Sequence, residues 1–160
     1  GEPCPRLMAA VADLEHYRFP PAAFDVILNL YFLERNWFYE YSRLLKPGGV
    51  LWLDTPNLSS LGAMRFGPHW RGLEVPRHLV LFCPSSMHKA LTAAGFHSFR
   101  QHWRGLSLFT VFAPSEALAR GEPATTASHQ GRPPLRDVLA ELREMVQPSR
   151  REFITISARK

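Results

Sequence analysis

The chain has 160 residues, of which 46% are hydrophobic and 21% charged, and it carries a formal net charge of +5. This balance excludes a disordered chain and suits one globular domain with one core, which we expect to span residues 1–160. The Lys and Arg residues are scattered rather than gathered in blocks, so we expect no nucleic-acid partner.

Cys4 and Cys83 are the only cysteines. Neither belongs to a CxxC motif, and two cysteines make no disulfide framework, so we expect a reducing, cytoplasmic location. No apolar run approaches the roughly 18 residues of a transmembrane helix, and no signal peptide is visible, so we expect no membrane partner. No cluster of His and Cys has metal-ligand spacing, and no metal site is predicted.

The first half of the chain alternates strand and helix patterns. Residues 7–14 predict a short strand, and the apolar run FDVILNL at 24–30 predicts a buried one. Residues 37–45 place Trp, Phe, Tyr and Leu on one helical face, and the KPGG that follows ends the helix. Residues 50–54 predict a second buried strand. Two buried strands joined by a helix are expected to be parallel, with a right-handed crossover.

The next stretch mixes loop and helix signals. Residues 56–82 are aromatic and loop-like, and we predict no regular element there. Pro84 occupies the favoured first position of a helix whose apolar face ends before Gly95. Residues 96–103 suggest a strand, whereas residues 107–119 are apolar and ambiguous.

The last part begins with the one stretch of low complexity, at residues 121–134, which predicts a mobile loop. Residues 135–146 carry apolar side chains at helical spacing, and 153–157 (FITIS) alternate as a strand does. The alternation of strands and helices along the chain predicts an α/β fold with a central sheet.

Polar residues stand at the ends of the two buried strands. Asn29 lies near the end of the first, and Asp54 and Asn57 follow the second. Because α/β sheets bind ligands outside the carboxyl ends of their strands, we expect a site there. The alternatives are a buried Asn29 satisfied by backbone, and Asp54 and Asn57 as loop-forming residues around Pro56.

Four segments in this order resemble a known family. They are ADLEHYRFPPAAFD, FDVILNLYFLE, RLLKPGGVLWLDTPN and HWRGLEVPRHLVLFCPSSMHKALTAAGF, which together cover roughly residues 7–103. The combination resembles the C-terminal half of class I S-adenosylmethionine (SAM)-dependent methyltransferases that act on small molecules.

The resemblance implies a partial Rossmann-like sheet with flanking helices. The family's strand order is 3-2-1-4-5-7-6, and this chain would supply strands four, five, seven and six, with residues 7–14 as a candidate strand three. Residues 24–30 would then form an exposed apolar edge, open to pairing with a partner.

The resemblance also implies residues for the cofactor, SAM. Asp13 would accept a hydrogen bond from the adenine amino group, and Leu14 would add a backbone contact. Asn29, Leu30 and Tyr31 would line the cofactor at the end of the fourth strand. A turn-forming Asp at the end of a strand is the alternative for Asp13.

The acceptor side is expected to involve loop residues. Asp54, Asn57 and Trp70 would line the substrate, and packing is the alternative for Trp70. Arg71 and Arg77 could bind an anionic group, or lie solvated on the surface. His78 could take a proton from the acceptor as the catalytic residue, or be a structural His bonded to backbone.

The family's glycine-rich turn after its first strand is missing from this sequence. We therefore expect the chain by itself to be inactive, and to be part of a longer methyltransferase or a degenerate one. The alternative function is a non-catalytic, methyltransferase-like module that serves dimerisation or partner binding. A nicotinamide-dependent enzyme is a weaker interpretation, since it also needs a Gly-rich first turn.

Overall fold

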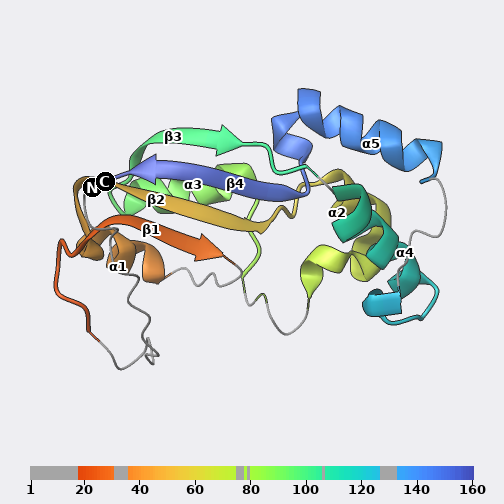
Figure 1. Cartoon of the computed structure of the whole chain (residues 1–160), viewed down its shortest axis with the longest axis horizontal. Coiled ribbons are helices and arrows are strands. Elements are labelled where there is room, and N and C mark those ends of the chain that lie inside the picture. The colour runs from red at the N-terminus through yellow and green to blue at the C-terminus, as the bar shows by residue number, and fades with distance from the viewer. Residues whose placement is uncertain (1–17, 31–35, 75–77, 79, 106, 127–132) are drawn as a thin grey trace, which may run out of the picture.

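The computed structural model describes residues 18–30, 36–74, 78, 80–105, 107–126 and 133–160 (Figure 1). The strand predicted over 7–14 and most of the mobile loop predicted over 121–134 lie outside the described residues.

A four-stranded sheet forms the centre of the fold. Its strands are β1 (Phe24–Leu30), β2 (Leu45–Pro56), β3 (His97–His102) and β4 (Phe153–Arg159), in the order β1-β2-β4-β3. β1 and β2 are parallel, and β4 runs antiparallel to both β2 and β3. The predicted α/β class, the parallel pair and the four strands are confirmed. Their order matches the expected sequence four, five, seven, six.

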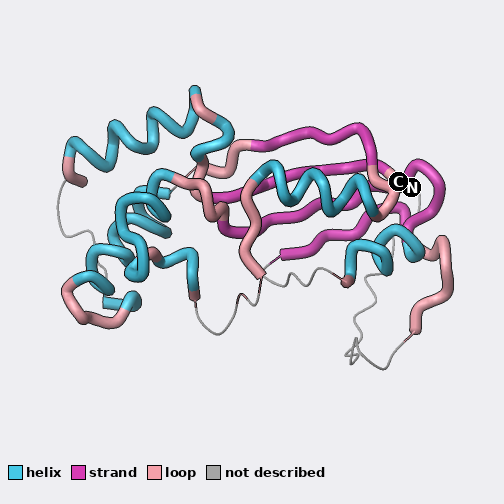
Figure 2. The backbone as a smooth tube through the Cα atoms, turned by 180° about the vertical axis from the view of Figure 1, so that it is seen from behind, coloured by secondary structure: helices cyan, strands magenta, loops and turns pink. Residues whose placement is uncertain are grey.

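Two helices cover one face of this sheet, as Figure 2 shows from behind. They are α1 (Trp37–Leu44) and α3 (Pro84–Ala93), and both were predicted from their apolar periodicity. Pro84 opens α3 because its missing N–H is not needed in a first turn, and Gly95, with φ of +90°, follows its end. The main core lies between these helices and the sheet; it includes Phe38, Leu45, Leu51, Leu53, Phe82, Met87, Leu91, Ile154 and Ile156.

The other face of the sheet has no helix over it in the described part of the chain (Figures 1 and 2). Val26, Leu28 and Leu30 of β1 point to this side and are 54%, 66% and 50% exposed. Trp52 on β2 stacks on His102, with ring centroids 4.1 Å apart. Parallel strands are normally covered on both faces. β1 has the apolar sequence of such a buried strand, yet this face of it is exposed to solvent.

A group of helices lies beyond the carboxyl ends of β1 and β2 (Figure 1). It consists of α2 (Leu61–Phe66), α4 (Ala113–Ala119) and α5 (Leu135–Val146) with the short turns between them, and we call it the cap. Trp70, Val111 and Phe112 are the buried centre of its apolar cluster. The prediction of loop alone over 56–82 is wrong, since α2 forms there. The ambiguous stretch 107–119 is helical, a π turn at Leu108–Phe112 leading into α4.

Helix α5 is present as predicted, but its orientation is unusual. Its two buried side chains are the carboxylates of Asp137 and Glu144. Its leucines at 135, 139 and 142 are all more than half exposed. The buried acids are held by specific partners: Arg65 pairs with Asp137 at 2.6 Å, and the Ser107 hydroxyl donates to Glu144 at 2.8 Å.

Candidate functional site

A cavity of about 300 Å³ lies between the end of β2 and the cap. It is lined from the sheet side by Asp54, Thr55, Pro56 and Phe153, and from the cap side by Arg71, Gly72, Glu74, His78, Arg104, Thr110 and Val111. Three residues that the sequence nominated, Asp54, Arg71 and His78, are thus brought together. The position agrees with the rule that α/β sheets bind ligands at the carboxyl ends of their strands.

Asp54 forms the floor of the cavity on the sheet side. In the sheet it lies beside Leu30 of β1 and Thr155 of β4. One carboxylate oxygen accepts from the Arg104 guanidinium at 2.5 Å, and the other accepts from the Thr155 hydroxyl at 2.6 Å. Two charge-assisted hydrogen bonds fix this buried carboxylate in place.

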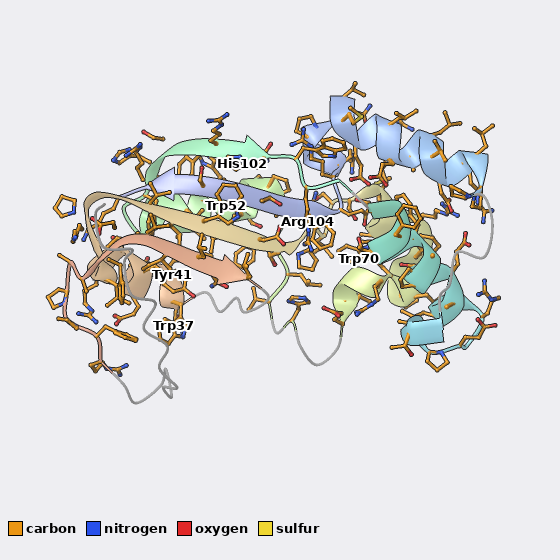
Figure 3. The ribbon with its side chains drawn as sticks, in the orientation of Figure 1. Trp37, Tyr41, Trp52, Trp70, His102 and Arg104 are labelled. Carbon is orange, nitrogen blue, oxygen red and sulfur yellow. The ribbon has the colours of Figure 1, made fainter. Side chains whose placement is uncertain are left out.

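Arg104 reaches the cavity from the segment after β3, and Figure 3 shows it between the sheet and the cap. Its guanidinium also lies over the Phe153 ring, 4.3 Å from the centroid. The ring and the carboxylate of Asp54 therefore fix the plane of the guanidinium together.

The opposite wall carries a second charged group made of Arg71, Glu74 and His78. One Glu74 oxygen pairs with Arg71, and the other lies 3.3 Å from Nε2 of His78. The His78 side chain is only 3% exposed. A carboxylate at Nε2 favours the tautomer with the proton on that nitrogen, which leaves the lone pair on Nδ1.

Local packing sets the position of Arg71. Gly72 lies flat against the Trp70 ring, where a side chain would collide. The backbone N–H of Arg71 donates to the Ser115 hydroxyl at 2.9 Å, which ties this turn to α4. The glycine and the serine thereby hold the arginine at the cavity wall.

Trp70 and Asn57 do not line this cavity. Trp70 is 2% exposed, and its indole N–H donates to Glu152 at 2.9 Å (Figure 3). Asn57 is fully buried and donates to the backbone carbonyls of Ser149 and Arg151. Both placements match the alternatives of packing and loop formation rather than substrate contact.

The end of β1 opens on a second pocket, of about 380 Å³. Asn29 and Leu30 line it together with Phe19, Phe24, Val26, Ile27, Leu28, Trp37, Tyr41 and Leu44. The buried Asn29 donates its amide to the Tyr41 hydroxyl, a contact between α1 and β1. The other nominated residues, Asp13, Leu14, Tyr31 and Arg77, lie outside the described residues.

The described lining of this second pocket meets only part of what SAM requires. Its aromatic and aliphatic side chains suit a flat, apolar-faced ring such as adenine. Its polar side chains, Asn29 and Tyr41, bond to each other. No carboxylate or glycine turn for the ribose and methionine lines the pocket among the described residues. These residues alone do not fit the whole cofactor.

A buried acidic cluster supports the cap from behind the cavity. Glu152 accepts from the backbone of Gly62 at 2.5 Å, from Ser60 at 3.0 Å and from Trp70 at 2.9 Å. Burial raises the pKa of Glu152 above its usual range, although these bonds oppose the rise. Burial likewise raises the pKa of Glu144 to about 7, so this carboxyl is partly protonated at neutral pH.

Sequence reasoning missed Arg104, Glu74 and Thr155. Glu74 stands three residues after Arg71 and four before His78, and that spacing was the available signal. Arg104 and Thr155 meet Asp54 only through the order of the sheet, which no local pattern reveals. Within the described residues no cluster of His, Cys, Asp or Glu could hold a metal ion.

The order β1-β2-β4-β3, with the cavity at the carboxyl end of the parallel pair, defines a class I SAM-dependent methyltransferase-like fold. No protein-family model and no curated protein sequence matches the chain. Solved structures do match it, and they agree on this fold.

A SAM-dependent methyltransferase of Thermotoga maritima, described as a possible histamine N-methyltransferase, is similar over 93% of this chain with 15% identity and a TM-score of 0.51. The YcgJ protein of Bacillus subtilis is similar over 93% of this chain, with 16% identity and a TM-score of 0.51. This chain spans 62% of the first structure and 69% of the second. A SAM-dependent methyltransferase of Archaeoglobus fulgidus is 17% identical, with a TM-score of 0.48, and this chain spans 61% of it.

Proposed function

We propose that the chain is the acceptor-binding portion of a SAM-dependent methyltransferase that acts on a small molecule. The observation that supports this most is the cavity at the end of β2, which gathers Asp54, Arg71, His78 and Arg104. Its volume of about 300 Å³ is at the lower end of small-ligand sites.

The charges of the cavity suit a polar acceptor. Asp54 and Glu74 can receive an amine or hydroxyl, and Arg71 and Arg104 can hold a carboxylate or phosphate. Each of these side chains already has a partner of opposite sign. A ligand that carries groups of both signs can replace such pairs without leaving a charge unpaired, so a zwitterionic or amphoteric acceptor fits better than a purely anionic one.

His78 is the candidate for moving the acceptor's proton. Glu74 at its Nε2 orients the ring and leaves Nδ1 as the basic nitrogen. Methyl transfer depends first on alignment of the methyl group and the nucleophile, so the base adds to the rate rather than enabling it.

The first test is calorimetric titration of the folded, monodisperse chain with S-adenosylhomocysteine. The proposal expects saturable binding at one site, weaker than in enzymes with a glycine-rich turn. Leu30→Glu, at the end of β1, should abolish it, whereas Tyr39→Gln on the outside of α1 should not. A folded wild-type chain that does not bind S-adenosylhomocysteine, by heat or by equilibrium dialysis, would favour the second candidate function below.

The second candidate function is a non-catalytic module that binds a partner or a second copy. The exposed row Val26, Leu28 and Leu30, on an edge strand with no neighbour among the described residues beyond it, favours this candidate. Light scattering during gel filtration distinguishes it: a stable dimer that does not bind S-adenosylhomocysteine supports the module.

A further inference from the structure

The outer surface of α5 is a line of apolar side chains without a cover in the described part of the chain. Leu135, Leu139, Leu142 and Val146 are 72%, 55%, 53% and 76% exposed, and we call them the α5 stripe. Their spacing of four, three and four residues places them on one line along the helix. Soluble proteins rarely leave such a line open, so it marks a contact surface.

Arginines border the stripe along one side. Arg136 and Arg143 lie roughly 70–90° around the helix from the centre of the stripe, at about 100° per residue. A groove between α5 and α2 is lined by these two arginines, by Leu139 and Ala140, and by Leu61 and Arg65 of α2. Of the three acids of α5, Asp137 and Glu144 are buried and Glu141 is half-buried.

The positive charge on this border is only partly neutralised. Arg136 is 66% exposed and contacts Glu116 at 2.5 Å and Asp137 at 3.6 Å. Arg65 shares both acids, at 2.8 Å and 2.6 Å, so two carboxylates face these two arginines. Arg143 bonds to the neutral side chain of Gln147 at 3.3 Å. The net charge of the whole chain, +5, has the same sign.

We propose that α5 docks in the plane of an anionic lipid bilayer, with the α5 stripe in the acyl boundary and Arg136 and Arg143 at the phosphates. Surface-lying helices combine an open apolar face with basic side chains that extend from its border to the headgroups. The proposal does not depend on the methyltransferase function.

The border of arginines favours a bilayer over a second copy of the chain. If two α5 helices packed antiparallel through their stripes, the arginine borders of both copies would fall on the same side of the seam. Like charges set against each other disfavour that pairing, whereas anionic headgroups oppose the same arginines favourably.

The proposal departs from the expectation of no membrane partner that the sequence suggested. That expectation rested on the lack of a spanning segment, and no helix in the described ranges is long and apolar enough to cross a membrane. A helix that lies on the surface needs no such length, because one apolar face is enough.

Vesicle co-sedimentation tests the proposal with the 160-residue chain. The chain is mixed with phosphatidylcholine vesicles, with and without phosphatidylglycerol. It should sediment with the anionic vesicles, more weakly with the neutral ones, and less as salt is added.

Arg143→Gln should lower the partition coefficient about fivefold, as expected for one arginine near the surface. The pair Leu139→Gln and Leu142→Gln should lower it about tenfold or more.

Tyr39→Gln is the matched control, because Tyr39 is 61% exposed on α1, at the other end of the molecule. It should bind vesicles as the wild type does. Equal binding to both vesicle types, no binding to either, or binding unchanged by the stripe substitutions would overturn the proposal. A dimer that dissociates on Leu142→Gln, with no sedimentation of the wild type, would assign the stripe to a second copy instead.

Discussion

Two buried carboxyls, Glu144 and Glu152, connect the cap to β4. The raised pKa of Glu144, about 7 against its ordinary value of 4.5, comes chiefly from burial. The folded protein therefore holds this proton more tightly than the unfolded chain does. Stability from this group is present below pH 4.5 and is lost as the pH rises to about 7.

We therefore expect the free energy of unfolding to fall across that range by up to about 1.4 kcal/mol per pH unit for this group. Glu144→Gln removes the titration and should flatten the profile. Urea unfolding at both ends of the range measures this. Glu122→Gln, on the surface, should leave the slope intact; a wild-type stability that rises with pH over the range would contradict the assignment.

Gly62 lies so close to the buried Glu152 carboxylate that there is no space for a side chain. A Cβ there would lie 2.5 Å from a carboxylate oxygen of Glu152. Gly62→Ala should cost about 2 kcal/mol of stability, because the buried acid cannot move without breaking its bonds to Ser60 and Trp70. The double variant with Glu152→Asp tests the cause: the shorter acid should make the two losses less than additive, and strict additivity would refute the contact.

Among the helices and strands described, β1 is the element that we expect to promote self-association of the chain. Its row Val26, Leu28 and Leu30 lies on the uncovered face of the sheet, and its outer edge pairs with no described strand. Leu28→Lys should reduce self-association at high concentration, because an edge charge opposes strand addition. Sedimentation velocity measures it. Leu58→Lys, equally apolar and 50% exposed outside the sheet, is the control and should have little effect.

Local patterns predicted β1, α1, α3 and β4 because each combines a clear apolar period with a strong boundary, such as Pro84 or the KPGG before residue 50. They failed for α2, whose six residues carry too short a pattern to distinguish from a loop. They predicted α5 but not its orientation. The side of α5 that faces the rest of the protein carries the buried acids, because they bind Arg65 and Ser107. These partners are distant in sequence, so no local pattern indicates them.

The same limit applies to the site. Asp54, Arg71 and His78 could be nominated because they stand beside a strand end or in a family-like segment. Arg104 could not, since it meets Asp54 across a separation of 50 residues. A strand end predicts where a cavity opens, but the side chains that complete it depend on the order of the sheet.

The whole molecule has two parts (Figure 1). One is the sheet together with α1 and α3, and the other is the cap. β4 joins the two, because Glu152 just before it anchors the cap while its own residues fill the sheet. Removing residues 147–160 should therefore disrupt both parts rather than one. Circular dichroism and amide exchange of the truncated chain should show an unfolded sheet; retained protection in β2 would contradict this.

The central place of β4 also affects how the chain is made. β2 and β3 are both translated before β4, yet β2 needs β4 on its second edge, and β3 pairs with β4 alone among the described strands. Until residues 153–159 emerge, the parallel pair of β1 and β2 is half a sheet, and β3 has no neighbour. The nascent chain thus carries open strand edges until β4 has been made. Its yield in a cell should depend on chaperones that hold such intermediates, even where the finished fold is stable.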